Sequence, residues 1–510
     1  MNTNNANLYA LFAANFPTDL SSCCIETEDR RYFSWSDVER ASAKMANLLT
    51  SLNLQVGARV AVQVEKSAEA LILYLATIRA GYVYLPLNTA YRDAEVDYFI
   101  RDAQPEVVIC SPQQFGWVSQ LAFKAGSRHV FTLDAPAEGN NSGSLLPLAL
   151  SQSDQFETAQ SLPHDLAAIL YTSGTTGRSK GAMLTHANLA SNAKVLKQAW
   201  GWNKDDVLLH ALPLFHVHGL FVASHGALLN GTKMIFLPRF NARQIIHYLP
   251  RTTVFMGVPT YYVRLLQESG FTQDICKNMR LFISGSAPLL SDTFAEFSQR
   301  LQHTILERYG MSETTMLTSN PYVGQRLGGT VGKPLAGVDV RVVTANMGMC
   351  GVDEIGDIQV RGANVFQGYW RMPEKTAEEF TDDGYFRTGD VGKFDSEGYL
   401  SIVGRSKDLI ISGGYNVYPK EIESFIDDMP EVLESAVIGL PHAEFGEAVA
   451  AIIILKPKEV LTEQTLINRL KGMIANFKVP KKVFFLDELP RNAMGKVQKN
   501  LLRTQYQGNE

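Results

Sequence analysis

Short apolar runs that alternate with amphipathic segments restrict the fold of this chain more than any other feature. Trp35 to Leu52 and Ala68 to Arg79 have helical spacing, whereas Val60 to Val64 and Tyr82 to Leu87 have the pattern of strands. Further strand-like runs are Val107–Cys110, Ala167–Tyr171, Val207–Leu212, Met234–Leu237, Val254–Met256 and Leu281–Ser284. Because several of these runs are apolar nearly throughout, we expect sheets that are buried on both faces. The alternation predicts an α/β fold of stacked mixed or parallel sheets with helices.

The pattern changes beyond Gly351. Short segments with turn residues, such as DDGYF at 382–386 and DSEGYL at 395–400, indicate hairpins and a small β-barrel-like part. The C-terminal region has its own alternation, with helices expected at Pro419–Asp428 and Glu463–Ile474 and strands at Val432–Leu440, Ala448–Leu455 and Lys482–Leu486. We therefore predict an N-terminal domain at 1–403, a hinge at 404–407 and a small mobile α+β domain at 408–510. The Ser-, Asn- and Gly-rich stretch 134–160 is expected to be a surface excursion.

The composition excludes several classes of function. The 510 residues are 45% hydrophobic and carry a net charge of −5, so a large core is expected and the broad positive field of a nucleic-acid-binding protein is not. No apolar run approaches the length of a membrane span, and residues 1–29 contain no Lys or Arg. Five cysteines without a C-x-x-C pair favour a reducing compartment, and we expect a cytoplasmic protein. The sequence indicates no particular oligomeric state.

The segment Tyr171 to Gly181, YTSGTTGRSKG, follows directly on the apolar run Leu166–Leu170. Glycines let backbone N–H groups turn toward an anion, hydroxyls add donors, and cations add charge. The segment has all three, namely the glycines Gly174, Gly177 and Gly181, the hydroxyls of Thr172, Ser173, Thr175, Thr176 and Ser179, and the cations Arg178 and Lys180. We predict a cradle for a triphosphate, with a flexible surface loop as the alternative. The segment does not match the Walker A pattern.

This segment resembles the phosphate loop of the adenylate-forming enzymes, the superfamily of acyl-CoA synthetases, adenylation domains and luciferases. Four further stretches resemble elements of that family in the right order. Glu307–Thr314 (ERYGMSET) is similar to its Y-G-x-T-E element, Tyr385–Asp390 to its T-G-D element, Gly404–Asp408 to its hinge, and Pro490–Lys496 to its C-terminal lysine element. Together the five motifs cover the chain from about residue 30 to 500.

The resemblance implies that ATP, Mg²⁺ and CoA take part. Tyr309 would stack on adenine, Ser312 would contact the α-phosphate, and Asp390 and Arg405 would meet the ribose. The implied ATP-binding set is Thr172, Ser173, Gly174, Thr175, Thr176, Gly177, Lys180, Glu307, Arg308, Tyr309, Gly310, Ser312, Asp390, Arg405 and Lys496, with Glu313 and Thr175 as magnesium ligands. Read singly, Tyr309 is more typical of a core aromatic residue, and Glu313 and Arg405 of the surface.

Lys496 is the cation that best suits the chemistry. Joining a carboxylate to the α-phosphate brings two anions together, and a positioned ammonium can orient the carboxylate and stabilise the growing charge. With Lys180 and Glu313 it forms the predicted catalytic set; the alternative is a solvated tail lysine. A thiol must then reach the mixed anhydride. The resemblance implies that the C-terminal domain swings about Lys407 and that Gly413 and Gly414 line the CoA path, although a Gly-Gly pair is otherwise an ordinary turn.

Several stretches resemble malonyl-CoA synthetases in particular. They are YLPLNTAY (84–91), HALPLFHVHGLFVA (210–223), MRLFISGSAPLL (279–290), NVFQGYWRMPEKT (364–376) and GGYNVYPKEIES (413–424). The resemblance favours malonate as the substrate and implies a malonate–CoA ligase that works through a malonyl-adenylate. A short-chain or aromatic acid–CoA ligase, an adenylation module that loads a carrier-protein thiol, and a catalytically silent nucleotide-binding protein are the alternatives.

Malonate is a dianion, so its distal carboxylate must be paired inside the acyl pocket. Arginine suits this role because it binds a carboxylate through two nitrogens. Our first candidate is Arg280, with His218, Arg239 and Arg264 behind it; a surface cation at a strand entry is the alternative for Arg280. The remaining expected acyl-pocket residues are His216, Val217, Ser284, Gly285, Ser286 and Met311.

Overall fold

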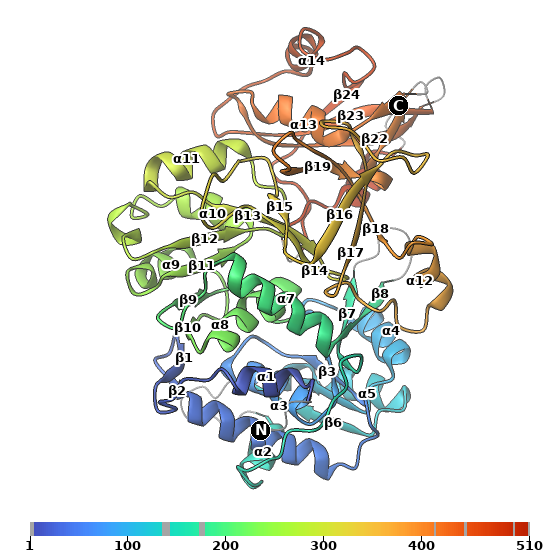
Figure 1. The fold of residues 1–510 in the computed structure, drawn as a ribbon. Helices are drawn as coiled ribbons and strands as arrows, with labels where there is room; N and C mark the ends of the chain where they lie inside the picture. Colours follow the sequence, from blue (N-terminus) through green and yellow to red (C-terminus); the bar gives the residue numbers. More distant parts are fainter. Residues whose placement is uncertain are drawn as a thin grey trace.

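The computed structural model describes residues 5–134, 143–172, 179–412, 415–442, 446–492 and 495–507. A six-stranded sheet lies in the N-terminal part (Figure 1). In spatial order its strands are β6 (His129–Thr132), β5 (Val107–Cys110), β3 (Arg59–Gln63), β4 (Val83–Pro86), β7 (Leu166–Thr172) and β8 (Lys180–Thr185). All neighbours are parallel except β7 and β8, which are antiparallel. The predicted phosphate segment therefore joins two antiparallel strands.

A nine-stranded sheet packs beside the first one. Its strands in spatial order are β15 (Lys333–Pro334), β14 (Thr315–Ser319), β13 (Leu306–Met311), β12 (Leu281–Ser284), β11 (Val254–Gly257), β9 (Val207–His210), β10 (Lys233–Phe236), β1 (Cys23–Thr27) and β2 (Tyr32–Ser34). The strands from β13 to β1 are parallel, and β2, β14 and β15 are antiparallel additions at the two sides. The carboxyl ends of the parallel strands therefore meet at one edge.

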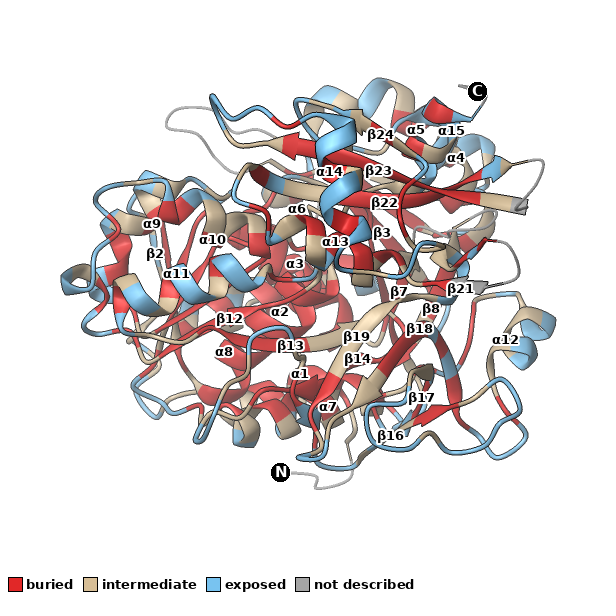
Figure 2. Cartoon of the chain, turned by 90° about the horizontal axis from the view of Figure 1, so that it is seen from above, coloured by how far each residue is buried: buried red, intermediate tan, exposed pale blue. Residues whose placement is uncertain are grey.

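Helices fill the space between the two large sheets and cover their outer faces. All twelve residues of α3 (Ala68–Arg79) are buried, as expected of a helix that is apolar on most sides. It shares a core with α1 (Leu8–Ala13), α2 (Trp35–Ser51), α7 (His186–Ala199) and α8 (His225–Asn230). The outer faces carry α4 (Asp93–Ala103) and α5 (Phe115–Lys124) on one sheet, and α9 (Ala242–Tyr248), α10 (Pro259–Leu266) and α11 (Ser291–Leu301) on the other. In Figure 2 the strands β3 and β12 are almost wholly buried.

Two smaller sheets complete the chain. The hairpins beyond Gly351 form an antiparallel sheet of β16 (Val338–Val343), β17 (Gly356–Gly362), β18 (Phe386–Phe394) and β19 (Leu400–Arg405), with α12 (Pro373–Glu379) between β17 and β18. The last sheet contains β21 (Tyr415–Val417), β20 (Ile410–Ser412), β23 (Gly446–Leu455), β22 (Val432–His442) and β24 (Lys482–Phe485), with α13 (Pro419–Asp427), α14 (Glu463–Lys471) and α15 (Lys499–Tyr506). The short turn η5 (Ser406–Asp408) connects the two sheets. The last sheet lies at the top of Figure 1.

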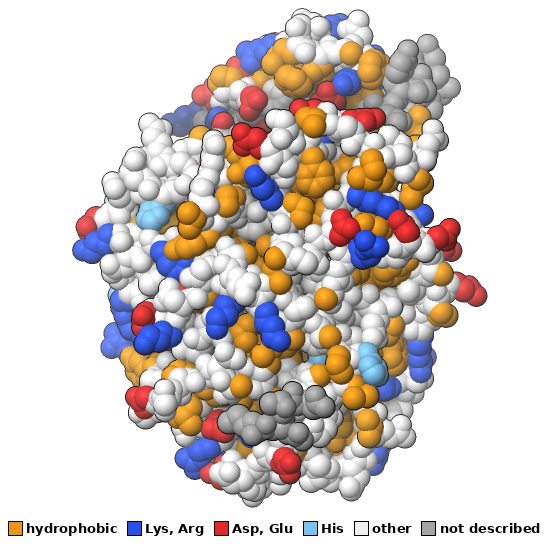
Figure 3. Space-filling view, viewed as in Figure 1, with side chains coloured by type: hydrophobic (Ala, Val, Ile, Leu, Met, Phe, Trp, Pro, Cys, Tyr) orange, Lys and Arg blue, Asp and Glu red, His pale blue; other side chains and the backbone are white. Residues whose placement is uncertain are grey.

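The predicted α/β class is confirmed, and β5, β12 and α3 have the predicted bounds. Within 134–160 the chain forms α6 (Leu145–Leu150), which packs on α2. All five cysteines are free thiols. Among the described residues, no helix combines the length and hydrophobicity needed to cross a bilayer. On the face shown in Figure 3, acidic and basic side chains are interspersed, without a broad basic area.

Candidate active site

The carboxyl ends of β9, β12 and β13 bring together most of the polar side chains that were expected to bind an acid. His216 and His218 follow β9, Gly285 and Ser286 follow β12, and Arg308 lies in β13. Ser284 pairs with Glu307 in the β12–β13 register, so Arg308 projects just beyond the end of β12. This edge is where α/β sheets bind ligands.

Arg308 is a buried cation that lacks partners for much of its guanidinium. The residue is 3% exposed, and its Nε and Nη2 atoms have no hydrogen-bond partner among the described residues. The group lies flat against Gly285, where an added Cβ would come within 2.5 Å of the Arg308 Cζ atom. Burial lowers the pKa of Arg308. Because an unpaired buried charge is costly, this position is suited to a bound anion.

Three further polar groups surround this guanidinium. Ser284 has a buried hydroxyl without a partner among the described residues, and the same holds for the Nε2 atom of His218. Ser286 adopts φ 72°, which is rare for a residue with a side chain, and its Oγ lies 3.3 Å from Nδ1 of His218. Burial and the Arg308 charge lower the pKa of His216 to about 4 and hold that of His218 well below its usual range. Both imidazoles are therefore neutral, so that Arg308 supplies the positive charge here.

Arg280 does not reach this pocket, and its predicted role as the ligand of the distal carboxylate is corrected. It precedes β12, at the opposite end of the strand from Gly285. Its Nε and Nη2 atoms donate to both carboxylate oxygens of Asp206, at 2.6 and 2.5 Å, and Nη1 donates to the Trp200 carbonyl at 2.9 Å. The guanidinium also packs on the ring of Tyr322. Arg280 is a structural cation that is already fully paired.

Replacement of Arg280 by Met should therefore weaken the fold and leave acid recognition unchanged. The Asp206 side chain is only 1% exposed, so it would be left as an unpaired buried carboxylate. We expect the free energy of unfolding to fall by about 3 kcal/mol, measured by urea denaturation, with an unchanged KM for the acid. Arg243→Met, at an exposed arginine, is the control and should change neither quantity. A raised KM in the Arg280 variant with normal stability would contradict this assignment.

Arg239 and Arg264, the other predicted arginine candidates, differ from Arg308 in burial. Both side chains are exposed, and they lie in the loop after β10 and in α10, respectively. The position of Arg308 in the ERYGMSET motif predicts that it binds ATP, as the resemblance implies. Neighbouring residues of a strand point to opposite faces. That alternation already separates Arg308 from Tyr309 and makes Arg308 a candidate for a cation that faces the acid rather than the nucleotide.

A second group of side chains forms the predicted nucleotide side of the site. The Tyr309 hydroxyl donates to one Asp390 oxygen at 2.5 Å, and Nε of Arg405 lies 2.8 Å from the other. Asp390 and Arg405 face each other across the β18–β19 pair. The three predicted ribose and adenine residues are thus in direct contact. Position 310 requires a glycine for steric reasons, because an added Cβ would lie 1.9 Å from the Thr315 carbonyl oxygen.

Lys180, Glu313 and Tyr369 meet beside this group. The Tyr369 hydroxyl donates to Glu313 Oε1 at 3.0 Å, and Nζ of Lys180 lies over the Tyr369 ring at 4.3 Å and 3.5 Å from a Glu379 oxygen. Burial raises the pKa of Glu313, an effect that Tyr369 and the nearby cations Arg405 and Lys180 oppose. Mg²⁺ usually binds one or two carboxylates plus phosphate oxygens. A single buried carboxylate beside a lysine fits that pattern.

Three cations gather where the C-terminal domain meets this group. The Lys496 side chain is exposed to solvent. Its pKa is nevertheless lowered to about 8, mainly because the surrounding protein desolvates the ammonium and secondly because of the Arg405 charge. Desolvation and Arg405, followed in smaller measure by Lys496, also lower the pKa of Lys407 to about 8. The preceding Gly495 packs against Thr260 of α10, so that a Cβ added at Gly495 would lie 3.1 Å from the Thr260 hydroxyl oxygen. Mutually repelling cations held together in this way are suited to a polyanion.

The other predicted residues have mixed outcomes. Ser173, Gly174, Thr175, Thr176 and Gly177 of the phosphate segment, and Gly413 and Gly414 of the expected CoA path, lie outside the described residues. Thr172 is the last residue of β7, and its hydroxyl donates to the Lys180 carbonyl oxygen at 3.4 Å. Burial raises the pKa of Glu307 to about 8, so this side chain can exist as a neutral acid that donates a hydrogen bond.

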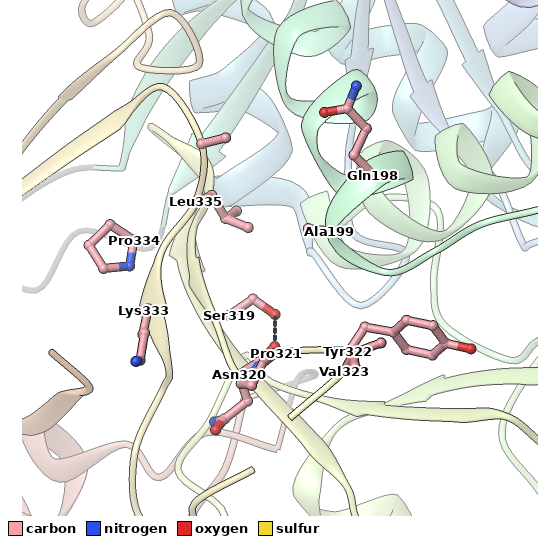
Figure 4. A pocket seen from close by; sticks show the side chains of 11 residues that line it. Gln198, Ala199, Ser319, Asn320, Pro321, Tyr322, Val323, Lys333, Pro334 and Leu335 are labelled. Atoms are coloured by element: carbon pink, nitrogen blue, oxygen red, sulfur yellow. Dashed lines mark hydrogen bonds between the residues drawn. The ribbon is translucent and has the colours of Figure 1, made fainter. Parts of the chain in front are cut away.

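Val217 and Met311 both pack in the core between the sheets, and Met311 and Ser312 come just after Tyr309 and Gly310 in the chain. The hollow in Figure 4 lies elsewhere, between the end of α7 and the strands β14 and β15. None of the acid-binding or nucleotide side chains described above lines it. The candidate site is therefore the edge formed by β9, β12 and β13 together with Tyr309, Asp390 and Lys496.

Comparison with known proteins gives consistent matches. The model of the AMP-binding enzyme family matches residues 12–370, and that of the AMP-binding enzyme C-terminal domain matches residues 421–496. A malonate–CoA ligase of Arabidopsis thaliana is 36% identical over 488 residues, which cover 89% of this chain and 79% of that protein. ATP-bound MatB from Rhodopseudomonas palustris is 53% identical, with a TM-score of 0.96 over 99% of both chains. The structure of apo MatB from the same organism has a TM-score of 0.84 at the same identity and coverage. The structure of this chain is therefore more similar to ATP-bound MatB than to apo MatB.

Proposed function

The chain belongs to the AMP-binding enzyme family, and we propose that it is a malonate–CoA ligase. In the proposed reaction, ATP and malonate give malonyl-adenylate and pyrophosphate, and CoA then gives malonyl-CoA and AMP. The similarity to a malonate–CoA ligase over most of the chain supports this choice of acid. The five free thiols are typical of a reducing compartment, and we propose the cytoplasm as the site of action.

The observation that carries the choice of acid is the unpaired guanidinium of Arg308. A monocarboxylate with an apolar tail would leave this charge buried and unpaired, at a cost of several kcal/mol. Malonate places its second carboxylate about one carbon beyond the reacting one, so one carboxylate can meet Arg308 while the other faces the nucleotide group. His218 and Ser286 add neutral hydrogen-bonding groups beside it. The neutral imidazoles leave one positive charge for one carboxylate.

In the first half-reaction a malonate oxygen forms a bond to the α-phosphorus of ATP while the bond to the pyrophosphate oxygen breaks. Lys496, placed beside Arg405 and Asp390, offsets the repulsion between the two anions. Asp390 and Tyr309 hold the nucleoside, and Lys180 contributes charge near the phosphates. Mg²⁺ would be held by Glu313 and would neutralise phosphate charge; Thr175, predicted as a second ligand, lies outside the described residues.

In the second half-reaction the thiol sulfur bonds to the malonyl carbonyl carbon, AMP leaves with the electron pair of the C–O bond, and the thiol proton is released. Lys496 is proposed to occupy the reacting side during adenylation, a proposal that the contact of Gly495 with Thr260 supports. We propose that the domain at 408–510 rotates about Lys407 in η5 so that a CoA path replaces Lys496. Gly413 and Gly414 are proposed to line that path.

The test is release of AMP that depends on CoA, measured with a panel of acids. We expect malonate or methylmalonate to be preferred to acetate, butyrate and benzoate by about a hundredfold or more in kcat/KM, because only the dicarboxylates pair Arg308. Equal activity on butyrate or benzoate would instead identify a short-chain or aromatic acid–CoA ligase. Full adenylation without transfer to free CoA would identify a module that loads a carrier-protein thiol, and no pyrophosphate release with any acid would overturn the enzymatic function.

A further inference from the structure

Lys66 is a buried lysine to which the proposed mechanism gives no task. It follows the carboxyl end of β3 in the six-stranded sheet and is 9% exposed. Its ammonium donates to the His210 carbonyl oxygen at 2.7 Å, lies 2.8 Å from His210 Nδ1, and lies 4.2 Å from the centre of the Phe236 ring. No carboxylate forms an ion pair with it among the described residues. Lys66 and His210 are thus joined across the space between the two large sheets.

The contacts of His210 select one tautomer. The Gly219 carbonyl oxygen, 2.9 Å from Nε2, can only accept, so the ring proton is on Nε2 and Nδ1 accepts from Nζ of Lys66. The Nε2–H group then donates to the Gly219 carbonyl oxygen at 2.9 Å and lies 3.0 Å from the Ser224 hydroxyl. The Ser224 hydroxyl itself donates to the same carbonyl at 3.0 Å.

The receiving segment is η2 (His218–Ser224), a single stretch of π-helix. Such wide turns are rare and need local support. Gly219 passes so near Pro213 that an added Cβ would lie 2.0 Å from the Pro213 carbonyl oxygen. The first residue of η2 is His218, which faces Ser286 and Arg308. The position of η2 therefore sets the position of a donor or acceptor in the acid pocket.

We propose that Lys66 is a positioning residue for the pocket of the distal carboxylate, acting through His210 and the π-helix His218–Ser224. The proposal rests on the proposed function, because it concerns the same carboxylate. Lys66 holds His210 in the Nε2–H form, His210 fixes the Gly219 carbonyl, and η2 then presents His218 to the substrate. None of these three steps involves the nucleotide side of the site.

Two variants of similar size distinguish this role from mere packing. Lys66→Met keeps the apolar length but cannot donate, whereas Lys66→Gln keeps an N–H donor for His210. We expect Lys66→Met to raise KM for malonate by about tenfold to a hundredfold, with KM for ATP unchanged. Lys66→Gln should have a KM for malonate close to that of the original chain. Malonate should also raise the Tm of Lys66→Met less than that of the original chain, whereas ATP should raise both equally.

If the Lys66 variants do not fold, His210 provides the same comparison. His210→Gln can accept from Lys66 and donate to Gly219, whereas His210→Leu can do neither, so only the latter should lose affinity for malonate. The inference is overturned if Lys66→Met or His210→Leu leaves KM for malonate unchanged, or raises KM for ATP and malonate alike. If the original chain itself shows no preference for malonate, the proposed function fails instead, so the two failures are distinguishable.

Discussion

Replacement of Lys496 by Ala should lower the rate of malonyl-adenylate formation by about a thousandfold, the largest effect expected from any single change in this chain. Lys496 lies with Arg405 and Asp390 where the α-phosphate is proposed to react. Without its ammonium, the approach of two anions is no longer offset. The measurement is malonate-dependent release of pyrophosphate under single-turnover conditions.

The second half-reaction provides the internal control for this variant. Transfer from supplied malonyl-adenylate to CoA should continue at nearly the original rate, because Lys496 is proposed to leave the site before the thiol enters. Lys471→Ala, at an exposed lysine at the end of α14, should affect neither step. Equal losses in both half-reactions would contradict the proposed exchange of domain positions, and full adenylation by Lys496→Ala would contradict the role of the lysine.

Replacement of Arg308 by Met should lower kcat/KM for malonate by about a hundredfold, which corresponds to a loss of about 3 kcal/mol in transition-state stabilisation. The reason is that the distal carboxylate would enter a buried pocket with neutral imidazoles and hydroxyls but no positive charge. Methionine fills a similar volume, so butyrate should be used at least as well as by the original chain. The measurement is the ratio of kcat/KM for malonate to that for butyrate, by AMP release.

An exposed arginine is the matched control for this change. Arg264→Met in α10 should leave the ratio of malonate to butyrate unchanged. A loss of activity on both acids in Arg308→Met, with a lowered Tm, would indicate a structural role. An unchanged ratio with full activity would show that another cation pairs the distal carboxylate.

Much of the fold follows from local pattern. Helix α3 is apolar on most sides and lies between two sheets, and the run Leu281–Ser284 is apolar throughout and forms a central strand. In both cases the local composition is enough to predict a buried element, because nearly every side chain is apolar. The hairpin β7–β8 shows the limit of this reasoning. The strand before the phosphate segment was predicted, but the antiparallel return after it depends on pairing with β7 rather than on local composition.

The acid pocket could be predicted only in part. The resemblance predicted His216, His218 and Ser286 as acyl-pocket residues, and the structure brings these three together after β9 and β12, at the edge where α/β sheets bind ligands. The predicted role of Arg280 is wrong, because Arg280 precedes its strand and so lies at the other edge, next to Asp206. The contact between Lys66 and His210 could not be predicted at all. Those residues are 144 positions apart, and Lys66 follows a strand of one sheet whereas His210 lies in a strand of the other.

The most direct test of the account is a crystal structure of the enzyme with malonate and a non-reactive ATP analogue. We predict that one malonate carboxylate lies within hydrogen-bonding distance of the Arg308 guanidinium, beside His218 and Ser286, and that the other points toward Lys496 and the α-phosphate. A malonate bound elsewhere, with Arg308 paired to a protein carboxylate, would contradict the central claim.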